Sequence, residues 1–258
     1  MPVDDLADAL ASGRETDLAG ADLPAAHLVA LLTAPAPPGA PALRLRRATV
    51  TGALRLSGAR VGVPVELREC TFAHVPDLRM AELAGLALTG SHLPGLRAGN
   101  LRVAADLLLD DGFDAAGPVD LTDAQIGGSL RLSAGRLRGG GVADRVVVEG
   151  TCYARRLRAD DELRLPGARI TGNIDLAGAA LTSPSGDALD LTGVAIGGSL
   201  LAGRHATGPP FVARGRVRLA GARIGGDLVF SGAEVTSTTI PDPADDAPEG
   251  SRAPVLPA

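Results

Sequence analysis

The chain has 258 residues, of which 45% are hydrophobic but only 2% aromatic, and its formal net charge is −5. Its core must therefore be filled by Leu, Val, Ile and Ala, which suits narrow, repeated layers. The charge excludes the strongly basic balance expected of a nucleic-acid-binding protein, so the composition gives no strong nucleic-acid signal.

Residues 1–42 are predicted to form an N-terminal helical cap that ends in a Pro-rich linker. Asp22 stands before the apolar segment 23–33, with Pro24 in its first turn and Pro35 after its end. Asp just before a helix and Pro in its first turn are typical of a helix start, and Pro beyond the end stops the helix. The pattern predicts a helix here, capped by Asp22.

A shorter helix is expected over residues 4–11, because Gly13 follows it and can adopt the positive φ of a helix end. The helix over 23–33 would carry an apolar lid for the first repeat. The predicted lid residues are Leu28, Leu31 and Leu32.

Residues 43–235 form the predicted repeat domain and hold imperfect copies of one pattern, Leu-x-x-Ala-x-Ile-x-Gly-x-Leu-x-Leu. Repetition at a step of roughly 20–50 residues is typical of solenoids. The last three copies follow at steps of 26 and 28 residues, whereas weaker copies nearer the N-terminus follow at 21–22. The five clearest copies begin at Leu45, Leu121, Leu165, Leu191 and Leu219.

Short strands account for this pattern. In Val217-Arg218-Leu219 the outer residues point to one side and the middle residue to the other, as the two-residue period of a strand requires. The Gly-Ala and Gly-Gly steps allow positive φ and close backbone approach, so the chain can turn a tight corner. We therefore predict an all-β fold, a right-handed parallel β-helix. Two inward columns are expected: Leu165, Leu191 and Leu219, and Ile170, Ile196 and Ile224.

The C-terminal segment 236–258 is rich in Pro, Asp, Ser and Thr, a composition that predicts a disordered tail. The N-terminal residues Met1–Asp5 lack a basic stretch followed by an apolar one, so no signal peptide is expected. No apolar segment approaches the ~20 residues that span a bilayer. Together these features predict a cytoplasmic protein.

The repeats resemble divergent pentapeptide repeats, because Ala stands two residues before a central Ile or Leu, and Ala21-Asp22-Leu23 matches the Ala-Asp/Asn-Leu consensus. The segments LRLSGARV, LTGSHLPGLRAGNLRV and LTDAQIGGSLRLSAGRL are more closely similar to a group of actinobacterial repeat proteins often labelled membrane-associated oxidoreductase. The likeness covers roughly residues 43–235. It implies a β-helix fold and, through the label, a redox role at a membrane.

No cofactor motif supports that label. The chain has no Lys, which excludes a Walker A phosphate loop, Schiff-base chemistry and the Tyr-x-x-x-Lys pair of short-chain dehydrogenases. A dinucleotide-binding turn needs Gly-x-Gly-x-x-Gly between a strand and a helix. Here Gly139-Gly140-Gly141 is followed by Asp144 at the third position, so we expect no bound cofactor.

No residue is assigned a catalytic, cofactor-binding or metal-binding role, and a non-catalytic protein is favoured over an enzyme. The histidines lack metal-ligand spacing, and neither Cys has an assignable catalytic His, which favours buried hydrophobic roles. Ser91-His92 would face opposite sides of a strand, and the acidic runs are interpreted as solvated turns. The residues considered are His27, His74, His92, His205, Cys70, Cys152, Asp110-Asp111, Asp160-Asp161-Glu162 and Asp245-Asp246.

The outward arginines form the one surface pattern that indicates a function. They share the outward middle position of the short strands with several acidic residues, so stacked turns would bring opposite charges together. A solvated ladder of mixed sign is favoured. The alternative is a docking face for an acidic protein or for anionic lipid headgroups. The residues are Arg44, Arg55, Arg131, Arg164, Arg218, Glu66, Asp120, Asp175 and Asp190.

The sequence therefore favours a non-catalytic β-solenoid scaffold or protein-interaction module, because solenoids supply extended surfaces and no reactive site is evident. Two alternatives stay open: a membrane-associated oxidoreductase component, and a DNA-mimicking protein similar to pentapeptide-repeat proteins. The partner is expected to be an unidentified protein, with peripheral membrane association as a further alternative. The sequence leaves the oligomeric state open.

Overall fold

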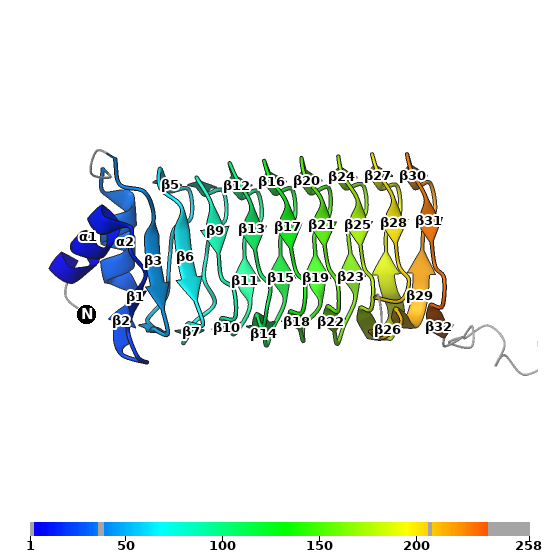
Figure 1. The fold of residues 1–258 in the computed structure, drawn as a ribbon, viewed down its shortest axis with the longest axis horizontal. Helices are drawn as coiled ribbons and strands as arrows, with labels where there is room; N and C mark the ends of the chain where they lie inside the picture. Colours follow the sequence, from blue (N-terminus) through cyan, green and yellow to red (C-terminus); the bar gives the residue numbers. More distant parts are fainter. Residues whose placement is uncertain (1–2, 36–38, 206–207, 237–258) are drawn as a thin grey trace, which may run out of the picture.

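The computed structural model describes residues 3–35, 39–205 and 208–236, and in them the chain winds into a parallel β-solenoid of about nine turns (Figure 1). Apart from two short helices at the N-terminus, every regular element described is a strand. The all-β parallel β-helix predicted from the repeats is confirmed. From residue 237 onward, the predicted tail lies outside the described residues.

Each turn has four faces, which we number in chain order. The first face is a ten-stranded sheet and the fourth an eight-stranded sheet. The first face contains β1 (Thr16–Asp17), β3 (Leu43–Arg46), β6 (Val65–Arg68), β9 (Leu86–Ala87), β13 (Leu107–Leu108), β17 (Leu130–Arg131), β21 (Cys152–Tyr153), β25 (Ile174–Asp175), β28 (Leu200–Leu201) and β31 (Leu228–Val229). The fourth contains β5 (Arg60–Val61), β8 (Glu82–Leu83), β12 (Arg102–Val103), β16 (Gln125–Ile126), β20 (Val147–Val148), β24 (Arg169–Ile170), β27 (Ala195–Ile196) and β30 (Arg223–Ile224).

The second and third faces together make a 14-stranded sheet, because β26 (Ala180–Asp190) and β29 (Val212–Arg218) run unbroken from one face to the other. The second face also contains β2 (Asp22–Pro24), β4 (Thr49–Thr51), β7 (Thr71–Phe72), β10 (His92–Leu93), β14 (Asp114–Ala115), β18 (Arg136–Leu137), β22 (Arg158–Ala159) and β32 (Glu234–Thr236). The third contains β11 (Leu96–Arg97), β15 (Val119–Asp120), β19 (Gly141–Val142) and β23 (Leu163–Arg164).

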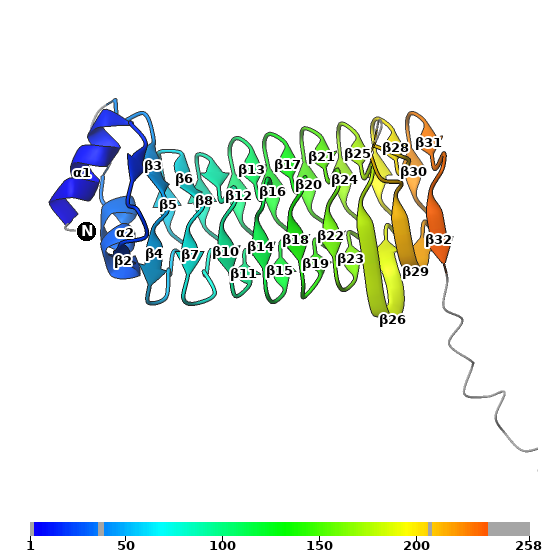
Figure 2. The same cartoon turned by 60° about the horizontal axis from the view of Figure 1, so that its bottom comes forward.

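The register between strands gives the length of each turn. Val65 pairs with Leu86 at a step of 21 residues, whereas Ile174, Leu200 and Leu228 follow one another at 26 and 28. Both step lengths read from the sequence are therefore present. The longer turns contain β26 and β29, and Figure 2 shows β26 extending past the edge of the other turns.

Within each turn, residues alternate between core and surface as the strand period requires. Leu163 and Leu165 are buried, while Arg164 between them points outward. The two predicted inward columns are confirmed, and their members are buried except in the last turn, where they are half-buried. The columns are Leu165, Leu191 and Leu219, and Ile170, Ile196 and Ile224.

The first of the five sequence copies does not occupy the same faces of the solenoid as the others. Its central residue lies two faces away from theirs. In the copy that begins at Leu121, the central Ile126 lies on the fourth face. In the copy that begins at Leu45, the central Val50 lies on the second face. The alignment of these copies as equivalent segments is wrong. A similar pattern of inward and outward residues recurs on every face, so the pattern alone cannot distinguish the faces.

The glycines serve two different purposes. Between the third and fourth faces, Gly167, Gly193 and Gly221 have φ of +67°, a conformation that side chains rarely adopt. The Gly-Gly steps at the end of the fourth face have no positive φ. Instead, a Cβ on Gly197 or Gly225 would overlap a carbonyl oxygen of the preceding turn. The Gly-Gly steps are thus required by the close approach of neighbouring turns alone.

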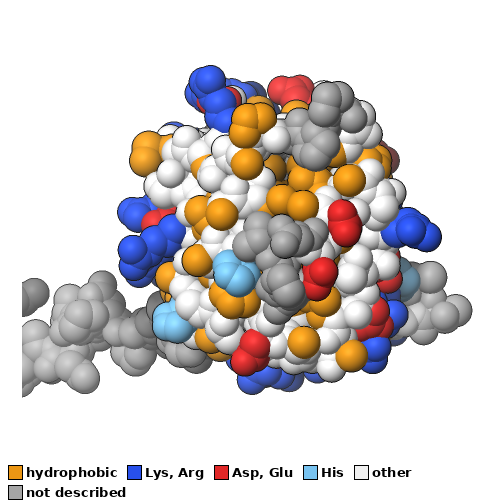
Figure 3. Space-filling model, turned by 90° about the vertical axis from the view of Figure 1, so that its left-hand side faces the viewer, with side chains coloured by type: hydrophobic (Ala, Val, Ile, Leu, Met, Phe, Trp, Pro, Cys, Tyr) orange, Lys and Arg blue, Asp and Glu red, His pale blue; other side chains and the backbone are white. Residues whose placement is uncertain are grey.

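Two helices, α1 (Val3–Ser12) and α2 (Ala25–Thr33), lie at the N-terminal end. Leu28 and Leu32 are buried, and Leu32 lines a small internal cavity with Leu54 and Leu56 of the first full turn. Leu31 packs half-buried against the same core. Figure 3 looks onto this end, where charged and histidine side chains interrupt the hydrophobic ones. The predicted lid is confirmed.

The predicted helix cap at Asp22 is wrong. Asp22–Pro24 is β2, which pairs with β4 on the second face, and α2 begins only at Ala25. Pro24 stands at the N-cap position without a side-chain capping hydrogen bond. Leu23 is fully buried, so pairing with the next turn and burial of Leu23 outweigh the local capping pattern.

We expect Ile196→Asp to destabilise the fold by about 4 kcal/mol or more, because the carboxylate would lie unpaired between Ile170 and Ile224. Urea or thermal unfolding measures this. The control is Ala195→Asp, which places the same charge on the outward side of the same strand and should change stability little. An unchanged unfolding midpoint for Ile196→Asp would contradict the inward column.

We expect Gly197→Ala to cost about 1–3 kcal/mol of stability, because the added Cβ would overlap the Thr171 carbonyl oxygen of the preceding turn. Gly62→Ala is the matched control. Gly62 has no positive φ, and a Cβ there would meet nothing within 4 Å. Equal stability losses in the two variants would show that close approach between turns does not explain the Gly-Gly steps.

Candidate interaction surface

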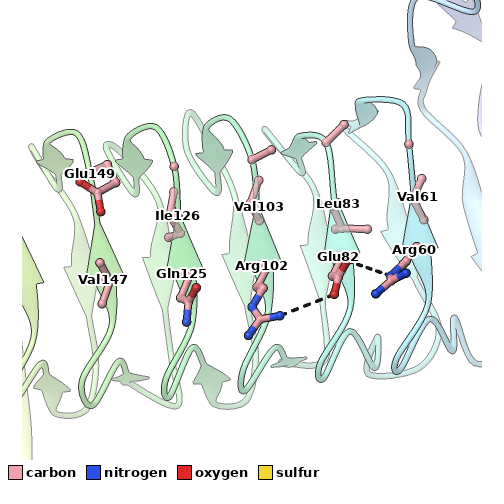
Figure 4. Close-up of a pocket in the computed structure, with 14 residues that line it drawn as sticks. Arg60, Val61, Glu82, Leu83, Arg102, Val103, Gln125, Ile126, Val147 and Glu149 are labelled. Carbon is pink, nitrogen blue, oxygen red and sulfur yellow. Dashed lines mark ion pairs between the residues drawn. The ribbon is translucent and has the colours of Figure 1, made fainter.

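The fourth face is hollowed along the solenoid axis. A groove of about 570 Å³ crosses five consecutive strands, from β5 to β20. Figure 4 shows the row of outward side chains that follows this groove, one from each strand. The row is Arg60, Glu82, Arg102, Gln125 and Val147, and beside it lie the small residues Gly62, Ala84, Ala104 and Gly127.

The N-terminal half of this groove is largely neutralised by its own ion pairs. Glu82 lies between two guanidinium groups, with Arg60 Nε at 2.9 Å and Arg102 Nη1 at 3.6 Å from its carboxylate oxygens (Figure 4). All three side chains are at least 40% exposed. Ion pairs this exposed contribute little to folding, so they mainly offset the charge of this surface.

The C-terminal half of the fourth face differs in charge. A second hollow of about 490 Å³ lies over β24, β27 and β30, and its lining contains Arg169 and Arg223 but no acidic residue. Both arginines are exposed, and within the described part of the chain neither forms an ion pair. Ala195 lies between them in register, so they are two strand spacings apart, about 9.5 Å.

The third face carries a ladder of alternating charge. Backbone bridges between turns place Arg55 opposite Asp77 and Asp77 opposite Arg97, and Arg97 pairs in register with Asp120. Beyond the uncharged Val142, the alternation continues. The stacked turns therefore bring the predicted outward residues together with mixed signs, as expected for a solvated ladder. The further members are Arg164, Asp190 and Arg218.

The other predicted outward residues lie on the first face. Arg44 Nε is 3.0 Å from Glu66 Oε1. Tyr153 lies between Arg131 and Asp175 in register. The guanidinium of Arg131 lies over its ring at 5.0 Å from the centroid. Arg155 contacts the same ring at 5.6 Å and donates to Asp175 through Nε. Charge is therefore locally paired on this face too.

Both cysteines lie in the core. Cys70 and Cys152 are 0% and 2% exposed. Burial raises the pKa of the Cys70 thiol to about 11 and that of Cys152 to about 12. Because the thiolate is the nucleophilic form, these thiols are unreactive near neutral pH. The interpretation as buried hydrophobic side chains agrees with this placement.

The Ser91-His92 pair is split across the sheet. The Ser91 hydroxyl is fully buried, donates to the Leu67 carbonyl at 2.7 Å and accepts from the Cys70 backbone N–H at 2.9 Å. His92 is exposed on β10. The two side chains therefore point in opposite directions, as the strand period predicts, and cannot act as a catalytic pair.

The histidines and the remaining acidic runs form no metal-binding group within the described ranges. The histidines lie on separate segments, with His27 in α2, His74 after β7 and His205 after β28. No group of three or more His, Cys, Asp or Glu side chains in these ranges is placed to hold a metal ion. Asp245-Asp246 lies outside them.

Asp110 is the most deeply buried carboxyl of the predicted acidic runs. It is 6% exposed, and burial raises its pKa, an effect opposed by the Thr89 hydroxyl, which donates to Asp110 Oδ1 at 2.8 Å. Its neighbour Asp111 occupies a corner with φ of +44°. This run is therefore a turn with an internal hydrogen bond. Asp160-Asp161-Glu162 likewise lies at a corner, between β22 and β23.

The Gly-rich segment has no dinucleotide-binding geometry. Gly140 makes a corner with φ of +73°, and Gly141 begins the short strand β19. A dinucleotide site needs a helix directly after such a turn, whose N-terminus binds the pyrophosphate. Here the next element is strand β20.

The fold and surface thus define a parallel β-solenoid whose fourth face is hollowed. Comparison with protein-family models, with curated proteins and with solved structures found no match. Neither described helix is long and apolar enough to span a membrane. Functional inference therefore depends on the surface itself.

We expect neither thiol to react with a disulfide reagent such as Ellman's reagent at pH 8 in the folded protein. This pH lies well below the raised pKa values of Cys70 and Cys152, so almost no thiolate is present. Both should react once the protein is unfolded in denaturant. Rapid reaction of one thiol under native conditions would show that its part of the core opens to solvent.

Proposed function

We propose that this chain is a non-catalytic scaffold that binds a protein partner through the hollow over β24, β27 and β30 on its fourth face. One observation carries the proposal: Arg169 and Arg223 are exposed on this face without an ion pair among the described residues. Unlike the arginines of the ladder, they have no acidic residue opposite them in register. A guanidinium presents a rigid fork of donors that matches a carboxylate.

The spacing of these arginines suggests the shape of the partner. A polyproline II segment repeats every three residues and rises about 9.3 Å in that distance. This matches the roughly 9.5 Å between two strand spacings. An acidic side chain at every third position would therefore meet Arg169 and Arg223 in turn. The small Ala195 and Gly197 between them leave room for the partner's backbone.

DNA mimicry is the weaker candidate. A DNA mimic needs a continuous row of negative charge, because it must replace the regularly spaced phosphates of a duplex. The third face instead alternates Arg55, Asp77, Arg97 and Asp120, and the fourth face is positive at its C-terminal half. This charge distribution favours an acidic partner.

The redox and membrane roles implied by the resemblance to actinobacterial repeat proteins have no supporting residue on the described surface. We also propose that the chain belongs to that group and is cytoplasmic. Anionic lipid headgroups could satisfy the same guanidinium groups, but a membrane is flat, whereas Arg169 and Arg223 line a hollow. We therefore favour an acidic protein segment.

We expect a labelled peptide of repeated Glu-Pro-Pro to bind the full chain, with an affinity that falls as salt is raised. Fluorescence anisotropy measures this. The double variant Arg169→Gln/Arg223→Gln should bind at least about tenfold more weakly, because both charge-assisted contacts are lost. A peptide of repeated Gln-Pro-Pro should bind poorly to either protein.

The matched control is Arg158→Gln/Arg214→Gln, which removes two exposed arginines from the second face. It changes the net charge equally but should leave peptide binding unchanged. If the two double variants lose equal affinity, binding depends on net charge alone and the hollow over β24, β27 and β30 is not the site. Preferential binding to vesicles of anionic lipid over the peptide would point to a membrane instead.

A further inference from the structure

The hollow over β24, β27 and β30 is open at its C-terminal side. β30 is the terminal strand of the fourth-face sheet, and within the described residues no further strand pairs with it. Arg223 lies on this strand and Arg169 lies two strands away, and both side chains are exposed. A chain segment can therefore enter the hollow from this side and meet Arg223 before Arg169.

The sequence that follows the described residues has the opposite charge. Residues 237–258 contain four acidic residues and a single basic one, Arg252. Two of the acidic residues, Asp246 and Glu249, form what we call the acidic pair and stand three positions apart. In a polyproline II segment that spacing is about 9.3 Å, close to the roughly 9.5 Å between the two arginines. The four acidic residues are Asp242, Asp245, Asp246 and Glu249.

The path of the preceding turn shows that this sequence is long enough to reach the hollow. Thr236, the last described residue, pairs in register with Arg214 on the second face. From Arg214 the chain passes around the third face and arrives at Arg223 nine residues later. Nine residues after Thr236 comes Asp245. The acidic pair begins at the next residue, so its first carboxylate can lie beside Arg223 and its second further along the hollow.

We infer that the chain's own acidic pair occupies the hollow, with Asp246 on Arg223 and Glu249 on Arg169, and that a partner must displace it. This inference rests on the proposed function, because it uses the same two guanidinium groups. Each contact is a charge-assisted hydrogen bond. Joined to the hollow by a short linker, the pair acts at an effective concentration on the order of millimolar. An acidic partner that makes similar contacts at a lower concentration is therefore excluded, so the segment regulates access to the site.

Binding of the labelled Glu-Pro-Pro peptide to the full chain tests this competition. Asp246→Asn/Glu249→Gln should strengthen peptide binding at least about threefold, the gain expected if the acidic pair fills the hollow in about two thirds of the molecules. The matched control is Asp227→Asn/Glu234→Gln, which removes the same charge from two exposed residues of the last turn. It should leave the affinity close to that of the original chain. Equal gains in the two variants, or no gain in the first, overturn the inference.

The arginine variant distinguishes this inference from the proposed function. Once Arg169→Gln/Arg223→Gln is present, removing the acidic pair should give no gain, because the peptide and the segment have lost the same binding groups. If the arginine variant binds the peptide as well as the original chain does, the proposed function fails. If it binds the peptide weakly, but loss of the acidic pair from the original chain gives no gain, only the inference about the segment fails.

A cross-link tests the contact without any peptide. Ala195 lines the hollow between the two arginines, Ala247 lies within the acidic pair in sequence, and both native cysteines are buried. Under mild oxidation, the full chain with Ala195→Cys/Ala247→Cys should form a disulfide within one chain. Leu201→Cys/Ala247→Cys, with its first cysteine in the same turn but on the first face, should form one at least about tenfold more slowly. Equal rates overturn the inference, and so does a disulfide between two chains, which would show that the segment binds another copy.

Discussion

Backbone hydrogen bonding between successive turns is the interaction on which the whole structure depends. A strand of two residues cannot stand alone, and each one here bonds only to the turns above and below. The Gly197 N–H donates to the Ile170 carbonyl and the Gly225 N–H to the Ile196 carbonyl, both at 2.8 Å. Unfolding of one turn therefore removes backbone hydrogen-bond partners from both neighbouring turns. Stability is thus a property of the whole stack and not of any single turn.

This stacking restricts what the interior can hold. Turns lie one strand spacing apart, about 4.8 Å, and two of the buried Phe side chains have small residues next to them in both neighbouring turns. Phe113 is fully buried, and register places it between Ser91 and Gly135. Phe211 lies in the same way between Ala179 and Ala233. Small neighbours thus accommodate these two rings within the stack.

The sequence could predict the features that depend on the two-residue period, and it could not predict those that depend on contacts between turns. Ile170, Ile196 and Ile224 were recognisable because their spacing equals the turn length. The strand role of Asp22 was not, because its partner β4 lies in the following turn. Nor could spacing alone show that Arg169 and Arg223 would share a hollow without an acidic neighbour.

Outward positions are where such a fold can specialise, because stacking constrains them only weakly. Like charges directly opposite in a sheet destabilise it, and the third face avoids them by alternating Arg55, Asp77 and Arg97. On the fourth face, Arg169 and Arg223 are separated by Ala195, which avoids the clash without neutralising either charge. This arrangement avoids like-charge repulsion within the folded sheet. It also leaves the two guanidinium groups available to a partner. Function in this chain is therefore to be sought where an outward charge has no oppositely charged neighbour in register.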